Sequence, residues 1–519
     1  MKSKGMIGLL ISVLLILGLV MACAPAAAPP TTPTTPTTPT TPTTPTTPTE
    51  PTTPAPGPDK PFMLEDTPEI KNKTPINMAL ASSGGNEAML GEMERWSKYT
   101  GIPVTSEIMI MSVVYPKINL ELISGAAAYD IVPVDGMGDE WFPYLYSLQD
   151  LGEMYDPGGV AALERELAEF DQTMLVMTSD KAGEVYGMPY YEYQMCQFIR
   201  QDIFDDPTEK ANFKAKYGYE LAPAKTYDEV YDLGQFFTRK EGELLKGEPL
   251  EWDLFGEVLQ AGRYEVNDEI YSRLWGAGSD FATLVRDKAG NPAEFVITKE
   301  NKETLKWALE GYKNELQWCS PGCESGFWDF AMSQFENGKC VFTPHMYSTL
   351  DFWAFNVEEN IPGAELAFYP CPLNGSGFTG TFYEAVSRAS RNPEAAYWLI
   401  RYLGSYEAQK RMAEELSFSI CRRDVIDDPK YQTPEWRKAC GARFAIVSHI
   451  WDNIQTPEVA SNYMYCNSSA IGKIYEMQII LCHEAVNGMR TIDDAVAEIT
   501  KQTIDLQTKF GTLPITEEL

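Results

Sequence analysis

Tyr129-Asp-Ile-Val-Pro-Val-Asp135 is the stretch that decides the fold predicted for this chain. Its apolar centre is typical of a buried strand, and a Gly-rich loop follows it. Two strands are predicted upstream, at 76–80 and 104–109, and each leads into a helix with an apolar stripe, at 86–100 and 116–124. This order of strands and helices predicts an α/β lobe built on a mainly parallel sheet.

Helix-capping patterns mark three later segments. Thr226-Tyr-Asp-Glu229 and Thr491-Ile-Asp-Asp494 each place a hydroxyl before a helix, and Asn392-Pro393 places a cap before proline at the first helical position. We therefore expect helices to start at these positions, and the α/β pattern to continue to the end of the chain.

The N-terminal residues have the pattern of a bacterial lipoprotein leader. Lys2 and Lys4 precede an apolar run from 6 to 21, and Cys23 follows a small residue at the place where a lipobox cysteine is acylated. The apolar run, about sixteen residues, is marginal for a membrane span. We predict a signal peptide at 1–22, lipidation of Cys23, and an extracytoplasmic protein anchored to the cell membrane. The alternative is a leader that is cleaved without lipidation.

Residues 23–58 are predicted to form a stalk. Thr-Thr-Pro repeats run from Thr31 to Pro54, and proline at every third position prevents helix and sheet. An extended polyproline II segment of this kind spans on the order of 100 Å. Its threonines are candidate sites for O-linked sugar. The folded domain is then expected at 59–519.

The charge balance excludes some partners. The chain has 42 basic and 74 acidic residues and a formal net charge of −32. Such a surface repels nucleic acid and anionic lipid headgroups, so neither is expected as a partner. A negative surface of this kind also favours binding of a cationic ligand. The simpler interpretation is that the charge keeps the protein soluble.

Cysteine and histidine usage argues against a metal site. Nine cysteines follow Cys23, so at least one stays unpaired, and Cys319-Ser-Pro-Gly-Cys323 is the best local candidate for a disulfide. No Cys-x-x-Cys occurs, and His345, His449 and His483 do not stand at ligand spacing with a cysteine pair. We predict no metal and no cofactor.

Several short motifs occur in the order seen in one known family. The chain resembles the extracellular solute-binding proteins, family 1, of ATP-driven (ABC) importers, the maltose-binding-protein-like group. No single motif is specific, but their common order over most of residues 76–425 is. The motifs are Tyr99-Thr-Gly-Ile-Pro-Val104, Leu122-Ile-Ser-Gly125, Tyr129-Asp-Ile-Val132, Val185-Tyr-Gly-Met-Pro189, Phe198-Ile-Arg-Gln-Asp-Ile-Phe204, Thr226-Tyr-Asp-Glu229, Phe335-Glu-Asn-Gly-Lys339 and the segment from Val386 to Ala396.

The resemblance implies a two-lobed, type II periplasmic-binding-protein-like fold with hinge crossovers. Lobe 1 would comprise about 74–193 and 377–415, and lobe 2 about 194–376 and 416–519. A ligand would be held between the lobes, hinge closure would follow, and a membrane permease would receive the solute. A monomer that captures a carbohydrate-type solute and performs no catalysis is therefore expected. The stretch at 240–263 and the many cysteines depart from the family pattern.

Loops after strands supply the candidate ligand contacts, because ligands of open α/β lobes bind beyond the carboxyl ends of the strands. Aromatic rings suit the C–H faces of sugars, and charged groups suit their hydroxyls. For each aromatic residue, core packing is the competing interpretation. The candidates are Asp135, Trp141, Tyr190, Tyr191, Glu192, Tyr271, Trp275, Tyr347, Tyr383, Glu384 and Arg422.

Two other functions stay open at this point. A stalked surface lipoprotein could bind a glycan polymer without transport, since the stalk is longer than an importer component needs. A glycoside-acting enzyme could use paired carboxylates such as Asp135 with Glu192 or Glu384. No nucleophile elbow, phosphate loop or metal motif supports catalysis.

Overall fold

Five strands form the first sheet, in the order β2-β1-β3-β13-β4. The computed structural model describes residues 61–83, 86–135, 140–348, 352–416, 418–436 and 440–518, all within one unit from Thr53 to Leu519. β1 pairs in parallel with β2 and β3, as predicted. The strands are β1 (Ile76–Ala81), β2 (Val104–Met109), β3 (Ile131–Val134), β4 (Gly187–Glu192) and β13 (Thr381–Val386). The leader, Cys23 and the whole predicted stalk at 23–58 lie outside the described residues.

The helices after β1 and β2 also agree with the sequence, with one difference. α2 (Asn86–Thr100) starts where predicted, whereas α3 (Met111–Ser124) begins before Pro116 and contains it. Ile110, in extended backbone, accepts the amide hydrogens of Val113 and Val114, so the first turn forms ahead of the proline. Gly125 ends α3 with a φ of 62°, a left-handed conformation that glycine adopts without strain.

A second sheet has the order β12-β5-β11-β8. Each of the two sheets contains one reversed strand: β13 is antiparallel to β3 and β4, and β5 is antiparallel to β11 and β12. Each reversed strand is the first one after the chain has crossed from the other sheet: β5 follows β4, and β13 follows β12. Its direction therefore follows from the crossover that leads into it. The strands are β5 (Met195–Arg200), β8 (Phe255–Glu257), β11 (Cys340–Tyr347) and β12 (Leu366–Tyr369).

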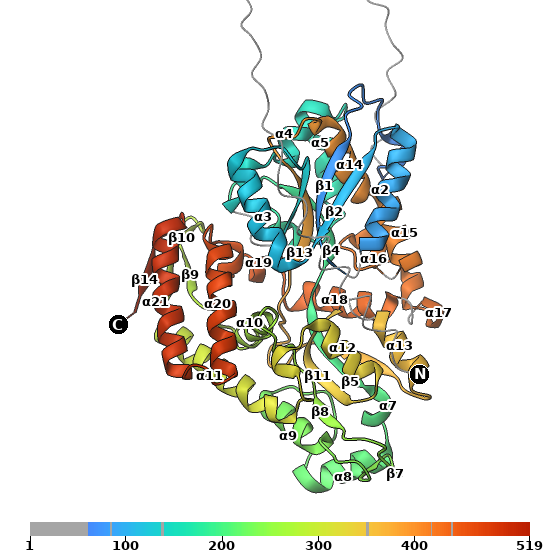
Figure 1. Cartoon of the computed structure of the whole chain (residues 1–519), viewed down its shortest axis with the longest axis vertical. Helices are drawn as coiled ribbons and strands as arrows, with labels where there is room; N and C mark the ends of the chain where they lie inside the picture. Colours follow the sequence, from blue (N-terminus) through green and yellow to red (C-terminus); the bar gives the residue numbers. More distant parts are fainter. Residues whose placement is uncertain are drawn as a thin grey trace, which may run out of the picture. The chain divides into compact units, whose positions relative to one another are not determined.

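Two crossovers connect the sheets and lie side by side (Figure 1). β4 continues through Tyr193 into β5, and the chain from β12 returns through Phe378 to β13. The amide of Tyr193 donates to the carbonyl of Gly380 at 3.2 Å, and that of Met195 to the carbonyl of Phe378 at 2.7 Å. Such paired, short connections are the structural basis of a hinge.

Helices cover both sheets, and the three predicted caps are confirmed: Thr226, Asn392 and Thr491 accept from the amides of Glu229, Ala395 and Asp494. Around the first sheet lie α4 (Leu148–Tyr155), α5 (Gly159–Leu167), α6 (Gln172–Met177), α14 (Pro393–Leu403), α15 (Tyr406–Leu416) and α16 (Arg423–Ile426). Those that follow β5 in the chain are α7 (Gln201–Phe204), α8 (Pro207–Tyr217), α9 (Tyr227–Phe237), α10 (Val266–Gly276), α11 (Lys299–Glu315), α12 (Trp328–Glu336) and α13 (Phe352–Asn360). The C-terminal helices are α17 (Pro434–Trp436), α18 (Ala442–Asn453), α19 (Pro457–Ala460), α20 (Ile471–Val486) and α21 (Ile492–Phe510).

The C-terminal part adds a third, small sheet that the sequence patterns did not indicate. β14 (Ile515–Glu517) pairs with β10 (Pro292–Ile297), which also pairs with β9 (Thr283–Arg286). α20 packs against α21 and α10 (Figure 1), and every residue of α10 is buried. In the 240–263 stretch, β6 (Leu244–Leu245) and β7 (Glu248–Pro249) form a hairpin. Among the described residues, no helix has the length and apolar character needed to cross a membrane.

The disulfide suggested for Cys319 and Cys323 is not formed. Both are buried thiols. Burial, followed by the neighbouring Cys323, raises the pKa of Cys319 well above its usual range, so this thiol is neutral and unreactive at ordinary pH.

Candidate functional site

A cleft at the crossovers brings together the loop ends of both sheets. Its first part, here called the aromatic chamber, has an empty volume of about 660 Å³ including the part open to solvent. It is lined by Ser82, Ser83, Asp135, Tyr191, Tyr193, Tyr264, Glu265, Asp268, Trp328, Tyr347, Phe378, Phe382 and Tyr475. Ser82 follows β1, Asp135 follows β3 and Tyr347 ends β11, so the lining comes from carboxyl ends of strands, as the α/β rule predicts.

A second part, the charged chamber, adjoins the first. It has an empty volume of about 1120 Å³ and is lined by Tyr115, Pro116, Asn119, Asp135, Glu140, Trp141, Tyr264, Gly472, Lys473, Tyr475, Glu476 and Ile479. Asp135, Tyr264 and Tyr475 line both chambers. The two chambers therefore form one cleft, with α3 on one wall and α20 on the other.

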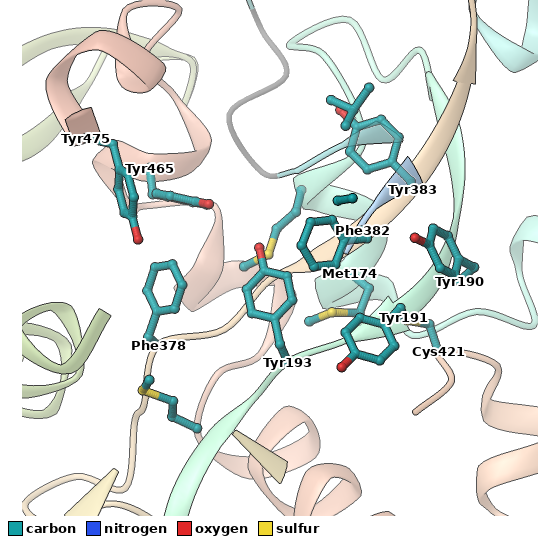
Figure 2. Packing of buried hydrophobic residues seen from close by; sticks show 14 of the residues in the cluster. Met174, Tyr190, Tyr191, Tyr193, Phe378, Phe382, Tyr383, Cys421, Tyr465 and Tyr475 are labelled. Atoms are coloured by element: carbon teal, nitrogen blue, oxygen red, sulfur yellow. The ribbon is translucent and has the colours of Figure 1, made fainter. Parts of the chain in front are cut away.

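The crossovers supply the aromatic floor. Figure 2 shows Tyr193 and Phe378 between Tyr465 and Tyr475 on one side and Phe382 and Tyr191 on the other. The ring of Tyr193 stacks on that of Phe378 with centroids 5.9 Å apart, and its centroid lies 5.4 Å from that of Phe382. These rings lie on the two crossover segments, so a ligand that contacts them contacts the connections between the two sheets.

Buried carboxylates and phenols form the polar part of the cleft. Asp135 accepts hydrogen bonds from Tyr115 at 3.0 Å, from Tyr465 at 3.3 Å and from Tyr193. Tyr115 and Asp135 belong to the first-sheet side and Tyr465 to the C-terminal part, so this cluster joins both walls. The cluster continues to Asp268 through Tyr475, whose ring lies 6.1 Å from that of Tyr465 and whose phenol donates to Asp268.

Asp268, in the first turn of α10, accepts from Tyr347 and Tyr475. Burial raises its pKa to about 7, although the two phenol donors act in the opposite direction. Burial also raises the pKa of Glu265 well above its usual range, and Asp268 adds to this effect. The cleft thus holds one acidic group, Asp268, that titrates close to neutral pH.

An ion pair crosses the charged chamber. Lys473 of α20 contacts Glu140, which follows the first-sheet strand β3 in the chain. Trp141 stands beside this pair; its indole donates to Asn119 at 3.1 Å and its ring packs on Tyr115 with centroids 5.6 Å apart. These contacts tie α20 to the opposite wall.

Of the residues predicted from the sequence, Asp135, Trp141, Tyr191 and Tyr347 line the cleft. The others do not line either chamber. Tyr190 and Glu384 are buried next to each other, and burial raises the pKa of both well above the usual range. Tyr383 is buried against Gly187, where a Cβ atom would come within 2.4 Å of its ring.

Glu192 lies at the end of β4, where its carboxylate is held by protein donors. Its carboxylate accepts from the amide of Gln194 at 2.7 Å, from Ser348 and from Ser419. It therefore joins the first crossover to β11 and to the segment after α15. Burial raises its pKa, and these hydrogen bonds oppose the rise.

Tyr271 and Trp275 support the cleft from behind. Tyr271 donates to Gln478 at 2.9 Å, and Trp275 stacks on Tyr463 with centroids 3.8 Å apart and on Phe378 at 5.6 Å. Both side chains are buried, so they position Phe378 and do not face the chamber.

Arg422 is committed to structural ion pairs. Its guanidinium contacts Glu166 and Asp424, and it donates to the carbonyl of Gly404 at 3.0 Å. The side chain is fully buried. Arg422 lines neither chamber of the cleft.

Several lining residues were missed by sequence reasoning. Ser82 and Ser83 follow β1 directly, and the rule about strand ends would have found them. Asp268, Trp328 and Tyr475 lie on helices and Glu265 directly precedes α10, and no local signal separates them from core residues. Their role depends on contacts between segments distant in sequence.

Two α/β sheets joined by paired crossovers, with an aromatic and acidic cleft at the crossing, define a two-lobed binding protein of the type II periplasmic kind. Residues 117–439 match the family described as bacterial extracellular solute-binding protein, and the chain belongs to that family. The matched region contains most of the aromatic chamber but not α20, which lines the far wall. The expected family resemblance and fold class are confirmed.

Solved structures of ABC transporter solute-binding proteins share the fold. A protein from Agrobacterium radiobacter K84 in complex with ribitol is 16% identical, with a TM-score of 0.62 over 83% of this chain and 98% of that one. Maltose-bound T. maritima MalE3 is 19% identical, with a TM-score of 0.60 over 84% and 100%. A protein from Agrobacterium vitis S4 with bound D-mannitol is 16% identical, with a TM-score of 0.62 over 84% and 99%.

Proposed function

We propose that this protein captures a sugar or polyol in the cleft between its sheets and delivers it, by hinge closure, to an ABC permease. The observation that carries the proposal is the aromatic chamber itself. Its rings, Tyr191, Tyr193, Phe378 and Phe382 among them, lie on the hinge segments, and its hydrogen-bonding groups come from both walls. Ligand binding there would couple directly to closure.

The chemistry of the chamber suits a polyhydroxylated ligand. The C–H faces of a sugar pack on aromatic rings, and its hydroxyls donate to carboxylates such as Asp135 and accept from phenols such as Tyr193. The ligands in the solved relatives, ribitol, maltose and D-mannitol, support this class. A binding role without catalysis is part of the proposal.

The proposal extends to the cell surface. A lipid on Cys23 and a stalk at 23–58 would hold the binding domain at the membrane, within reach of the permease. Mass spectrometry of the N-terminal peptide tests the lipid, and Cys23→Ala should release the protein into the medium. Retention of that variant at the membrane would contradict the anchor.

The ligand proposal is tested by calorimetry and thermal shift on the full-length chain in mild detergent, with mono- and oligosaccharides and polyols as ligands. A micromolar ligand at millimolar concentration stabilises by about 4 kcal/mol, which raises Tm by several degrees. Tyr191→Ala should abolish the shift, and Tyr99→Ala, an exposed tyrosine away from the cleft, should leave it unchanged.

The same preparation separates the alternatives. Binding to insoluble glycan without response to any soluble solute would favour a stalked polymer-binding lipoprotein. Turnover of a chromogenic glycoside would favour an enzyme. Silence across the soluble panel would overturn capture of sugars and polyols.

A further inference from the structure

The aromatic chamber carries an excess of carboxylates. Asp135, Glu265 and Asp268 line it, and none of the described residues that line it is basic. All three are buried, with exposed fractions of 7%, 8% and 4%. Buried charges of one sign are costly unless a charge of the opposite sign meets them.

The protein contacts of these carboxylates bring little positive charge. Asp135 and Asp268 accept hydrogen bonds from the phenols of five tyrosines, which are neutral. The N-terminus of α10 favours Glu265 and Asp268, but a helix dipole stabilises a charge by only about 0.3–1 kcal/mol. Most of the burial cost stays uncompensated, as the raised pKa values of Asp268 and Glu265 indicate.

Glu265 provides a second observation, independent of the excess of carboxylates, that points to a ligand. Its Oε2 atom is buried and has no hydrogen-bond partner among the described residues, although the side chain lines the chamber. The charged groups that act on it, Asp268, Glu269 and Asp329, are all acids. A buried acceptor that is left without a donor and faces a cavity is placed to receive a donor from a ligand.

Lys473, which lines the adjoining charged chamber, is already paired with a carboxylate. Its partner is Glu140, so its charge is matched there. Aromatic rings surround the carboxylates, with Tyr264, Trp328 and Tyr347 beside Glu265 and Asp268 in the lining. Rings of this kind attract a cation through their faces and exclude water from it.

We infer that the ligand of this cleft carries a protonated amine: it is an amino sugar or an amino polyol, whose ammonium group meets Glu265 and Asp268 while its hydroxyls meet Asp135 and the phenols. The inference rests on the proposed function, because it names the subclass of sugar-like solute that the site selects. An ammonium donates to the free Oε2 of Glu265 and supplies the positive charge that the chamber lacks.

The test uses pairs of probes that differ only in the amine. Calorimetry on the full-length chain at pH 7 compares glucosamine with glucose, galactosamine with galactose, and 1-amino-1-deoxysorbitol with sorbitol. N-acetylglucosamine keeps the nitrogen without its charge. The amino member of at least one pair should bind about tenfold more tightly or better, which is about 1.4 kcal/mol, and the acetylated probe should lose that gain.

Two matched variants locate the effect. Glu265→Gln removes the free carboxylate and should reduce the amine preference at least several-fold while affinity for the neutral partner changes little. Glu257→Gln makes the same change at another buried carboxylate, which has no hydrogen-bond partner within the described ranges and lines neither chamber. That variant should keep the full preference.

Each outcome bears on one of the two proposals. Equal or tighter binding of the neutral members would overturn the inference and leave sugar capture standing. Binding of putrescine or spermidine, with silence across all sugars and polyols, would overturn the carbohydrate class and retain the ammonium site. An amine preference unchanged in Glu265→Gln would overturn the assignment of the site.

Discussion

The phenol of Tyr193, on the first crossover, donates a hydrogen bond to Asp135, the residue that follows β3. The hinge is thereby fastened to the wall of the cleft by a buried polar contact. The same carboxylate also accepts from Tyr465 at 3.3 Å, which ties in the C-terminal part. Asp135 is thus a junction of the hinge, the first sheet and the far wall.

Tyr193→Phe should destabilise the protein by about 1–2 kcal/mol, because a buried hydrogen bond to a carboxylate is lost while Tyr115 and Tyr465 keep theirs. Urea unfolding measures the change. Tyr465→Phe removes the longer contact and is the control, with a smaller loss expected. An equal or greater loss in the control would contradict the central role of Tyr193.

Trp275→Ala should lower the free energy of unfolding by about 3–5 kcal/mol, because the ring is fully buried between Tyr463 and Phe378. Trp275→Phe should stay folded and bind ligand within about threefold of the parent affinity, a change below about 1 kcal/mol. Trp328→Ala, in the chamber lining, should lower affinity more than stability. Loss of binding in a folded Trp275→Phe would instead place this ring at the ligand.

Arg422→Met should destabilise by about 3–5 kcal/mol, because it leaves the largely buried Glu166 without its cation. Adding Glu166→Gln should recover part of this loss. Denaturant midpoints of the two variants give the comparison. Ligand affinity of the folded double variant should match the parent, and a large affinity loss would restore Arg422 as a binding residue.

Stability should fall as the pH rises from about 4 to about 7, through the titration of Asp268. The pKa of this carboxyl is 3.8 in an ordinary setting and about 7 in the folded protein, so the folded state binds the proton more tightly. The free energy of unfolding therefore decreases across that window, by roughly 4 kcal/mol at most from this group. Asp171 and Asp280, both raised to about 6, act in the same direction.

Asp268→Asn isolates the contribution of Asp268. Thermal unfolding at pH 5 and at pH 7.5 should differ less in this variant than in the parent. An identical pH dependence in both proteins would show that Asp268 does not titrate in this range.

Lys473→Met should weaken the contact between the opposite walls of the charged chamber, because Lys473 and Glu140 join them; under the proposed function this favours the open form. Both side chains are partly exposed, so the expected effect is about 0.3–1 kcal/mol and should shrink in high salt. Small-angle scattering with saturating ligand should show a larger radius of gyration for the variant at low salt. Lys302→Met, at the outer contact with Glu517, should leave it unchanged.

Local patterns in the sequence were sufficient for the first sheet. The alternation at 76–80, the apolar run before Asp135 and the caps at Thr226, Asn392 and Thr491 depend on backbone preferences and neighbouring residues, and the structure confirms them. The early start of α3 was missed because Pro116 looked like a first-turn residue, whereas Ile110 sets the helix start.

The candidate residues predicted near strand ends fall into two groups: some line the cleft, and others are held by protein partners. Contacts between segments distant in sequence decide which. Asp135 and Tyr347 reach the cleft because a strand end delivers them there. Glu192 and Arg422 were chosen for their charge, yet both are satisfied by partners distant in sequence, Ser419 and Glu166. No local pattern indicates whether a charge will meet a protein partner or a ligand.

The amino-acid sequence by itself determined the α/β order, the helix caps and the family resemblance, because these depend on residues close together in the chain. Only the tertiary structure decided which aromatic rings face the cleft, that β14 pairs with β10 in a third sheet, and that the Oε2 atom of Glu265 has no hydrogen-bond partner in the described part of the chain. The physical reason is that burial and pairing are set by segments far apart in sequence, here α10, α20 and the two crossovers, which meet only after folding.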